Sequence, residues 1–110
     1  MTKYIITGGA GFIGSHIVEH LVKKNKKVVV LDNLSTGRIE NLRDFKKKIK
    51  FIKCDISKKG KWMKEFQGRC YIFHIAALAD IVPSIQNPTK YFESNVTGTL
   101  NVLEASRRAK

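Results

Sequence analysis

The chain has 110 residues, 43% hydrophobic and 27% charged, a size and composition typical of one folded domain and not of a disordered chain. No apolar run approaches the roughly 20 residues of a membrane span, and no signal peptide is visible, so we expect a cytoplasmic protein without a membrane segment. The formal net charge of +12 keeps nucleic acid among the partners to consider.

The first two predicted elements are a strand over residues 3–7 and an amphipathic helix over residues 12–24. The strand is apolar at its centre, and the helix repeats apolar side chains at the spacing of one buried helical face. We expect four helix residues to point into a core: Ile13, Ile17, Val18 and Leu21.

A glycine-rich turn joins this strand to this helix. Its glycines fit two spacings, Gly9-x-Gly11-x-x-Gly14 and Gly8-x-x-Gly11-x-x-Gly14, both typical of dinucleotide-binding loops. Without side chains the backbone can turn tightly and approach a pyrophosphate, which the N–H groups and dipole of the helix N-terminus attract. The alternative is a glycine turn that binds no ligand.

A second predicted strand, over residues 28–31, ends at Asp32. The dinucleotide fingerprint has an acidic residue about 20 residues beyond the glycines, where it accepts hydrogen bonds from the ribose hydroxyls. A carboxylate there repels a 2′-phosphate, so this position favours NAD over NADP. The alternative is an ordinary strand-end aspartate, which the neighbouring glycine loop disfavours.

A strongly basic segment follows, with a short helix around residues 39–45, a strand over 49–54 and a helix over 58–66. Between Arg43 and Arg69 there are eleven Lys or Arg residues and three acidic ones. Most are lysines, and the segment lacks the exposed aromatic residues, zinc ligands and helix-turn-helix pattern of nucleic-acid-binding domains. We therefore interpret it as a solvated face and do not favour a nucleic-acid partner.

Two cysteines, Cys54 and Cys70, lie at the margins of predicted strands. Neither has the spacing to another cysteine or to a histidine that a metal site or redox motif requires. Because a cytoplasmic chain keeps such thiols reduced, we predict two partly buried free thiols and no metal site.

The last predicted elements are a strand over residues 70–76 and a long helix over residues 89–109, joined by a loop that contains two prolines. The strand is apolar almost throughout, as is typical of a parallel strand buried on both faces. The helix carries Asn95 among apolar neighbours, and a partly buried amide needs a hydrogen-bond partner.

The alternation of strands and helices predicts an α/β fold. We expect residues 1–110 to form one Rossmann-like, doubly wound parallel sheet in strand order 3-2-1-4, with a nucleotide across the carboxyl ends of the strands. The fourth strand then lies at an edge, where a further strand belongs. The sheet is therefore expected to be truncated after the fourth strand and its following helix, or to pair with another chain.

Five ordered segments together resemble the N-terminal part of NAD-dependent epimerase/dehydratases, which are extended short-chain dehydrogenase/reductases acting on nucleotide sugars. The subgroup that looks nearest is that of UDP-glucose 4-epimerase-like enzymes, chiefly through residues 32–37. The segments span residues 7–14, 32–37, 54–56, 74–77 and 95–101.

The resemblance implies NAD as the cofactor and assigns part of it to each matched segment. The pyrophosphate would lie against Gly8, Gly11, Phe12, Ile13 and Gly14. The adenosine ribose would bind Asp32, bordered by Asn33, Ser35, Thr36 and Gly37. The adenine would contact Asp55 and Ile56, and the rest of the cofactor would pass Ala76, Ala77, Ala79 and Asn95. Many galactose-type epimerases carry a longer polar side chain at the position of Ala79, which weakens assignment to that one enzyme.

Other interpretations of single residues stay open. Asp55 could cap the helix after the third strand. His74 is interpreted as a packed core residue in preference to a base. Ser84 could contact a substrate, as this loop does in relatives, or be a plain loop serine. Asn95 would also brace the active-site backbone.

Catalysis in the family uses a Tyr-x-x-x-Lys pair with a nearby Ser or Thr. The tyrosine removes a proton from a sugar hydroxyl while a hydride passes to NAD. None of the three tyrosines of this chain has a lysine four residues later. The resemblance therefore implies an NAD-binding N-terminal portion without catalytic residues or the substrate lobe, inactive alone, belonging to an NAD-dependent nucleotide-sugar epimerase or dehydratase.

Three hypotheses follow. In the first, the chain is the NAD-binding portion of an enzyme that forms a transient 4-keto sugar. In the second, it is a stand-alone NAD-binding or interaction module, whose exposed fourth-strand edge pairs with another chain or forms a homodimer. The third and least favoured is a basic nucleic-acid-binding domain.

Overall fold

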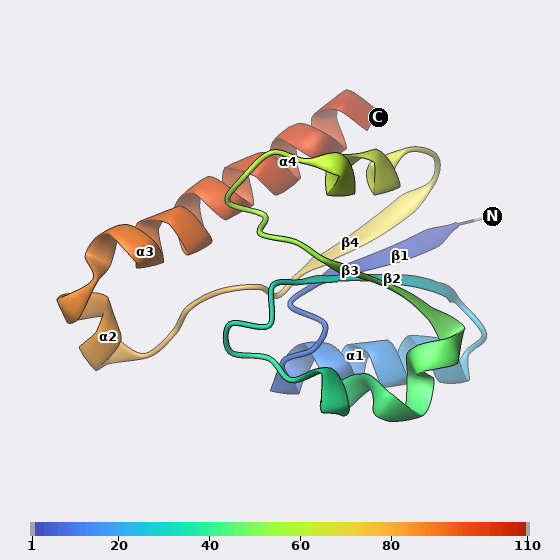
Figure 1. The fold of residues 1–110 in the computed structure, drawn as a ribbon. Helices are drawn as coiled ribbons and strands as arrows, with labels where there is room; N and C mark the ends of the chain where they lie inside the picture. Colours follow the sequence, from blue (N-terminus) through green and yellow to red (C-terminus); the bar gives the residue numbers. More distant parts are fainter. Residues whose placement is uncertain (1, 110) are drawn as a thin grey trace.

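The computed structural model describes residues 2–109 and contains one four-stranded parallel sheet between two layers of helices (Figure 1). The strands pair in the order β3-β2-β1-β4, which confirms the predicted Rossmann-like order 3-2-1-4. Their bounds are β1 (Lys3–Thr7), β2 (Lys27–Asp32), β3 (Ile49–Lys53) and β4 (Cys70–His74).

The remaining elements are helical, of which the first three connect successive strands and the others follow β4. They comprise α1 (Phe12–Lys23), the 3₁₀ helices η1 (Ile39–Lys48) and η2 (Lys61–Phe66), α2 (Ile81–Gln86), α3 (Pro88–Phe92), the π-helical turn η3 (Glu93–Thr97) and α4 (Gly98–Ala109). The last three follow one another without a break. Within residues 2–109, none of these helices combines the length and the apolar character needed to cross a membrane.

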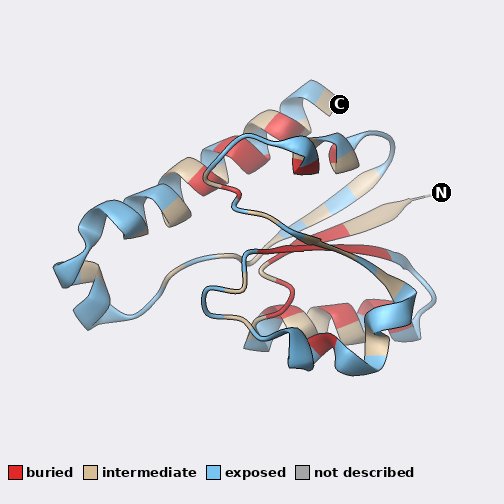
Figure 2. Ribbon diagram, viewed as in Figure 1, coloured by how far each residue is buried: buried red, intermediate tan, exposed pale blue. Residues whose placement is uncertain are grey.

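Two separate cores lie on the two faces of the sheet, because successive strand side chains point to opposite faces. One core packs β-strand residues against η2 and α4: Ile5, Val29, Leu31, Ile56, Trp62, Phe66, Val102 and Ala105. The other packs them against α1 and η1: Ile6, Ala10, Val18, Leu21, Val22, Val28, Val30 and Leu42. Figure 2 shows buried residues gathered in the strands and on the helix sides that face them, whereas α2 and α3 are mainly exposed.

The structure corrects two predictions about burial. Ile13 was expected in the core but is 62% exposed, and β4 was expected to be buried on both faces but leaves Tyr71 61% exposed. Both differences have one cause, since no described element covers the α1 side of the edge strand β4. Ile13 and Phe73 instead line an open apolar groove between α1 and β4.

Element ends also differ from the sequence-based expectation. β4 ends at His74 instead of residue 76, η2 begins at Lys61 instead of residue 58, and the loop around Pro83 contains the short helix α2. Pro83 is tolerated because it lies in the first turn of α2, where backbone N–H groups have no intrahelical acceptor.

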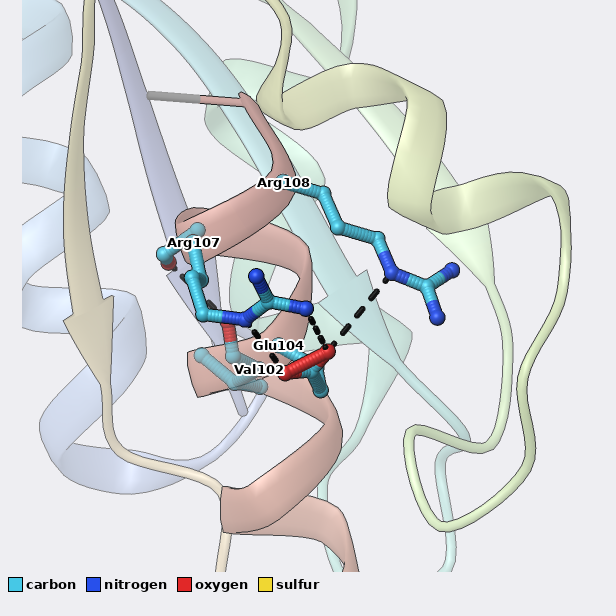
Figure 3. A network of polar contacts seen from close by, with 5 residues as sticks. Val102, Glu104, Arg107 and Arg108 are labelled. Atoms are coloured by element: carbon cyan, nitrogen blue, oxygen red, sulfur yellow. Dashed lines mark hydrogen bonds and ion pairs between the residues drawn. The ribbon is translucent and has the colours of Figure 1, made fainter.

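The C-terminal helix carries a surface ion-pair network and a buried anchor. Glu104 accepts hydrogen bonds from the guanidinium of Arg107 at 2.7 and 2.8 Å, and Arg108 lies 3.6 Å away (Figure 3). The hydrogen bond from Arg107 is the main cause that lowers the pKa of Glu104. Such exposed pairs contribute little to stability. By contrast, the buried Asn101 donates from Nδ2 to the carbonyl of Ile56 at 2.8 Å.

We predict that Asn101→Ala destabilises the chain, because the buried carbonyl of Ile56 then lacks its donor. The expected loss in the free energy of unfolding is about 1–3 kcal/mol, measured by urea denaturation of the 110-residue chain. Leu103→Ala is the matched control on the same helix, since Leu103 is 62% exposed, and it should change stability by less than about 0.5 kcal/mol. Equal effects of the two substitutions would contradict the anchoring role.

Candidate dinucleotide-binding site

Loops that leave the carboxyl ends of the strands are hydrogen-bonded to one another. The N–H of Gly8 donates to the carbonyl of Leu31 at 2.8 Å, and the N–H of Ile75 donates to that of Thr7 at 3.1 Å. These bonds continue the strand pairing beyond the sheet and hold the loops around a cleft of about 370 Å³.

Most of the residues predicted to bind the cofactor line this one cleft. They are Gly8, Gly11, Phe12, Ile13, Gly14, Asp32, Asn33, Ser35, Thr36, Gly37, Asp55, Ile56, Ala76 and Ala77. Ala79, Asn95 and the predicted substrate residue Ser84 are not among the residues that line it. Four of the five sequence segments that carried the family resemblance therefore line one cleft, whereas none of residues 95–101 is among its lining residues.

The glycine loop packs too tightly for side chains. Gly8 has a φ of 72°, and a Cβ atom there would lie 2.8 Å from the backbone N of Ala76. At the buried Gly14, a Cβ atom would lie 2.1 Å from the carbonyl oxygen of Gly8. α1 begins after Gly11 with no acidic residue in its first turn and, among the described residues, no side chain capping it, so its first N–H groups can receive an anion.

Asp32 connects the glycine loop to the loop that follows β2. Its Oδ2 accepts the N–H of Ala10 at 3.0 Å, and its Oδ1 accepts the N–H of Leu34 at 2.7 Å. Leu34 has a φ of 62°, a left-handed conformation that costs a leucine about 1–2 kcal/mol, and the bond to Asp32 offsets part of that cost. Because a carboxylate oxygen accepts more than one hydrogen bond, both oxygens can still receive ribose hydroxyls.

Asp55 is held in a turn and does not cap a helix. Its Oδ1 accepts both the N–H and the hydroxyl of Ser57, at 2.9 and 2.6 Å. The next helix, η2, has Gly60 at its N-cap, so the helix-capping interpretation of Asp55 is wrong. Ile56 beside it is buried at the base of the cleft.

The side chain of Asn95 holds the loop after β4 through two hydrogen bonds to its backbone. Its Nδ2 donates to the carbonyl of Leu78 and its Oδ1 accepts the N–H of the same residue, both at 2.8 Å. The expected bracing by Asn95 is thus present, although the side chain does not line the cleft. Ala79 lies exposed just beyond this clamp, and the Ser84 hydroxyl donates to the carbonyl of Ile81 within α2.

His74, interpreted as a packed residue, is half-buried at the end of β4 and does not line the cleft. Its Nδ1 lies 2.7 Å from the hydroxyl of Thr7, and its Nε2 lies 2.8 Å from that of Thr99. Burial lowers the pKa of this imidazole below its usual value.

Some residues that line the cleft were not predicted. They are Leu31, Cys54, Ser57, Ile75, Leu78, Lys90, Glu93 and Ser94. The first five are sequence neighbours of predicted residues, and their position at strand ends was the available signal. The last three come from the α3–η3 helix, and no local pattern indicates them because the position of this helix beside the cleft depends on tertiary packing. Within residues 2–109, no group of His, Cys, Asp and Glu side chains is arranged to hold a metal.

The sequence model of a protein family described as GDP-mannose 4,6 dehydratase matches residues 5–110. The chain belongs to this family. The match confirms the resemblance to nucleotide-sugar epimerases and dehydratases that the five motifs indicated.

Proteins that are similar in sequence belong to the same group of enzymes. A putative UDP-glucose 4-epimerase of Methanocaldococcus jannaschii is 41% identical over 105 residues, which cover 94% of this chain and 33% of the relative. A UDP-glucose 4-epimerase of Streptomyces lividans is 40% identical over 114 residues, which cover 97% of this chain and 32% of the relative. The chain therefore spans about a third of the length of these relatives.

Solved structures agree with the sequence relatives. The UDP-glucose 4-epimerase of Thermus thermophilus, in complex with NAD, has a TM-score of 0.86 at 40% identity, covering 97% of this chain and 34% of that protein. The dTDP-glucose 4,6-dehydratase DesIV of Streptomyces venezuelae, with NAD and TYD bound, has a TM-score of 0.90 at 34% identity. The match covers 97% of this chain and 36% of that protein. Both neighbours contain NAD.

We predict that Gly14→Ala destabilises the chain, because its Cβ would lie 2.1 Å from the carbonyl oxygen of Gly8. Relief requires a shift of α1 relative to β1, and such overpacking costs about 1–3 kcal/mol or more. Urea denaturation measures the loss. Gly60→Ala is the control, since a Cβ there meets nothing closer than 3.4 Å and the backbone is extended. A Gly14→Ala chain as stable as the control would show that the close approach is not required.

We also predict that the Cys54 thiol is unreactive near neutral pH. Burial, followed by the charges of Asp55 and Asp32, raises its pKa to about 11. In a Cys70→Ser chain, where Cys54 is the only thiol, alkylation by iodoacetamide at pH 8 should be about 100-fold slower than in the same chain unfolded in urea, because alkylation requires the thiolate. The rate should rise with pH up to about 11. Equal rates in the folded and unfolded chains at pH 8 would contradict this.

Proposed function

We propose that this chain binds NAD in the cleft at the carboxyl ends of β1, β2 and β4, as the dinucleotide-binding part of a nucleotide-sugar epimerase or dehydratase. The observation that carries the proposal is the convergence of the glycine loop, Asp32 and Ala76–Ala77 on one cleft. A phosphate site, a ribose acceptor and a wall of small side chains are together the recognition elements of a dinucleotide.

The pyrophosphate is proposed to lie at the N-terminus of α1. The fit is supported by the backbone itself, since the close approach of Gly14 to the carbonyl of Gly8 brings the start of α1 against the end of β1. The uncapped N–H groups and the helix dipole both favour a negative group there.

Selectivity for NAD over NADP is proposed to come from Asp32. The carboxylate is already fixed by the N–H groups of Ala10 and Leu34, so it needs no reorganisation to accept the adenosine ribose hydroxyls. A 2′-phosphate at the same place would meet its negative charge. Asp55 and Ile56 are proposed to contact the adenine, at the cleft wall formed after β3.

The substrate class is proposed from the relatives, whose names specify UDP-sugars and dTDP-glucose. When bound, NAD supplies a hydride acceptor for oxidation of a sugar hydroxyl, and the residues of this chain hold and orient it. No Tyr-x-x-x-Lys lies within the 110 residues. We therefore propose turnover for a protein of the relatives' length, with residues 1–110 as its NAD-binding portion, and binding without turnover for this chain alone.

A second role is suggested by the edge of the sheet. β4 is hydrogen-bonded to β1 on one side, and within residues 2–109 no strand pairs with its other side. Tyr71 and Phe73 beside that edge are 61% and 37% exposed. We propose that a further strand, from this protein or from a second copy, pairs with β4, in keeping with the tendency of open edges to find a partner.

Titration of the 110-residue chain with NAD and NADP tests the proposed function. We expect NAD to bind more tightly than NADP, and Asp32→Asn to weaken NAD binding about 10- to 100-fold, the effect of losing hydrogen bonds to a charged group. Asp44→Asn is the matched control, because its side chain is 80% exposed and does not line the cleft.

Two results would contradict the proposal. One is a folded wild-type chain that binds neither dinucleotide, and the other is Asp32→Asn with unchanged affinity for NAD. Circular dichroism of each variant shows whether a lost affinity reflects a lost fold. Conversion of a UDP-sugar by this chain alone would contradict the assignment of catalysis to residues outside it.

A further inference from the structure

Hydrogen bonds among Thr7, His74, Thr99, Asn95 and the backbone of the loop after β4 form a closed ring, in which His74 joins the two sides. On one side, the hydroxyl of Thr7 accepts the N–H groups of Ile75 and Ala76, at 3.0 and 3.2 Å, and lies 2.7 Å from His74 Nδ1. These two N–H groups belong to the segment 75–78, which lines the cleft. Thr7 therefore attaches the start of that segment to β1.

On the other side, the ring continues through α4 to the end of the same segment. His74 Nε2 lies 2.8 Å from the hydroxyl of Thr99, which donates to the carbonyl of Asn95 at 2.7 Å. The side chain of Asn95 then holds both backbone groups of Leu78. His74 thus links the two attachments of segment 75–78, one at each of its ends.

The positions of the protons in this ring follow from counting donors and acceptors. A threonine hydroxyl has one proton and two lone pairs. Because the proton of Thr99 is donated to the carbonyl of Asn95, its oxygen must accept a proton from His74 Nε2. The hydroxyl of Thr7 receives the N–H of Ala76 and shares the N–H of Ile75 with the carbonyl of Thr7, so its own proton is available for His74 Nδ1. A neutral imidazole protonated at Nε2 therefore satisfies every partner.

We propose that His74 is a positioning residue, which as the neutral Nε2–H tautomer orients the hydroxyls of Thr7 and Thr99 and thereby holds segment 75–78 in the form that lines the cleft. The effect on a bound dinucleotide rests on the proposed function, whereas the tautomer does not. A protonated ring would bring a third N–H toward the Thr7 hydroxyl oxygen, where it would compete with the N–H groups of Ile75 and Ala76 for two lone pairs.

Burial disfavours protonation of His74, and among the described residues no charged side chain is bonded to either of its ring nitrogens. The groups at its ring nitrogens are uncharged hydroxyls, from Thr7 on β1 and Thr99 on α4. The charged groups of the packed elements are Lys3 on β1, Glu93 on η3, and Glu104, Arg107 and Arg108 on α4. Burial is the cause that lowers the pKa of His74 from 6.5, since a buried imidazole disfavours its charged form.

The tautomer can be observed directly by ¹⁵N NMR of the labelled chain without any dinucleotide. We expect the His74 ring at pH 7 to show an unprotonated Nδ1 and a protonated Nε2. The chain has three histidines, so substitution of the exposed His16 and His20 identifies the His74 signals even where a His74 variant fails to fold. An Nδ1–H tautomer, or an imidazolium at pH 7, would overturn the proposal.

The functional consequence is a fall in NAD affinity at acid pH. Between the lowered pKa of folded His74 and 6.5, the unfolded chain binds more protons than the folded one, so stability falls as pH falls through this window. The cleft-lining conformation of the folded chain is lost only below the lowered pKa, where His74 becomes charged. We expect NAD affinity to be constant above the folded pKa and to fall by up to about tenfold per pH unit below it. A profile that stays flat down to pH 5 in the presence of a protonated His74 would overturn the proposal.

Two variants separate positioning from mere packing. His74→Asn keeps an acceptor for Thr7 but loses the donor to Thr99, and we expect about tenfold weaker NAD binding without the acid-side fall. His20→Asn, on the exposed face of α1, should keep the wild-type affinity and profile. A His74→Asn chain with the wild-type profile contradicts the proposal. No NAD binding by the wild type contradicts the proposed function, while the NMR result still decides the tautomer.

Discussion

The close approach of backbone to backbone at the glycine loop is the constraint on which the site depends. The carbonyl of Gly8 occupies the space where a Cβ of residue 14 would lie, and the α-carbon of Gly8 lies against Ala76. These contacts set the distance of α1 from β1 and of β1 from the loop after β4. Because the first turn of α1 lines the cleft, the N–H groups proposed to hold the pyrophosphate are positioned by main-chain packing and not by flexible side chains.

Local patterns in the sequence were sufficient for the sheet order and for most of the cleft. The glycines, Asp32 and the alternating elements carry their information within a few residues, and each was found where the pattern indicated. Ile13 and Tyr71 were misjudged because burial depends on whether another element covers a surface, which periodicity does not report. Lys90 and Glu93 were missed because they lie on the α3–η3 helix, whose position beside the cleft depends on tertiary packing that no local pattern reports.

The basic segment and the site are largely separate. Among the lysines of residues 2–109, Lys90 alone lines the cleft, together with the acids Asp32, Asp55 and Glu93. A lysine of the basic segment, Lys50, is instead paired with Glu65 at 2.7 Å on the surface. The net charge of the chain can raise the rate at which an anion approaches. In the proposed function, selection among anions depends instead on backbone N–H groups and on Asp32.

Three polar side chains in and around the cleft act in the same way, each binding the backbone of a loop that belongs to another element. Asp32 on β2 holds the loop after β1 through Ala10, Thr7 on β1 holds the loop after β4, and Asn95 on the helix holds its far end. The backbone does not depend on loop side chains for its shape, so small residues such as Ala76 and Ala77 suffice there. In a cleft built in this way, the proton of Thr7 must be donated to His74, that of His74 to Thr99, and that of Thr99 to Asn95. His74 is the member of this series that can gain a second proton and so break the order of donors and acceptors.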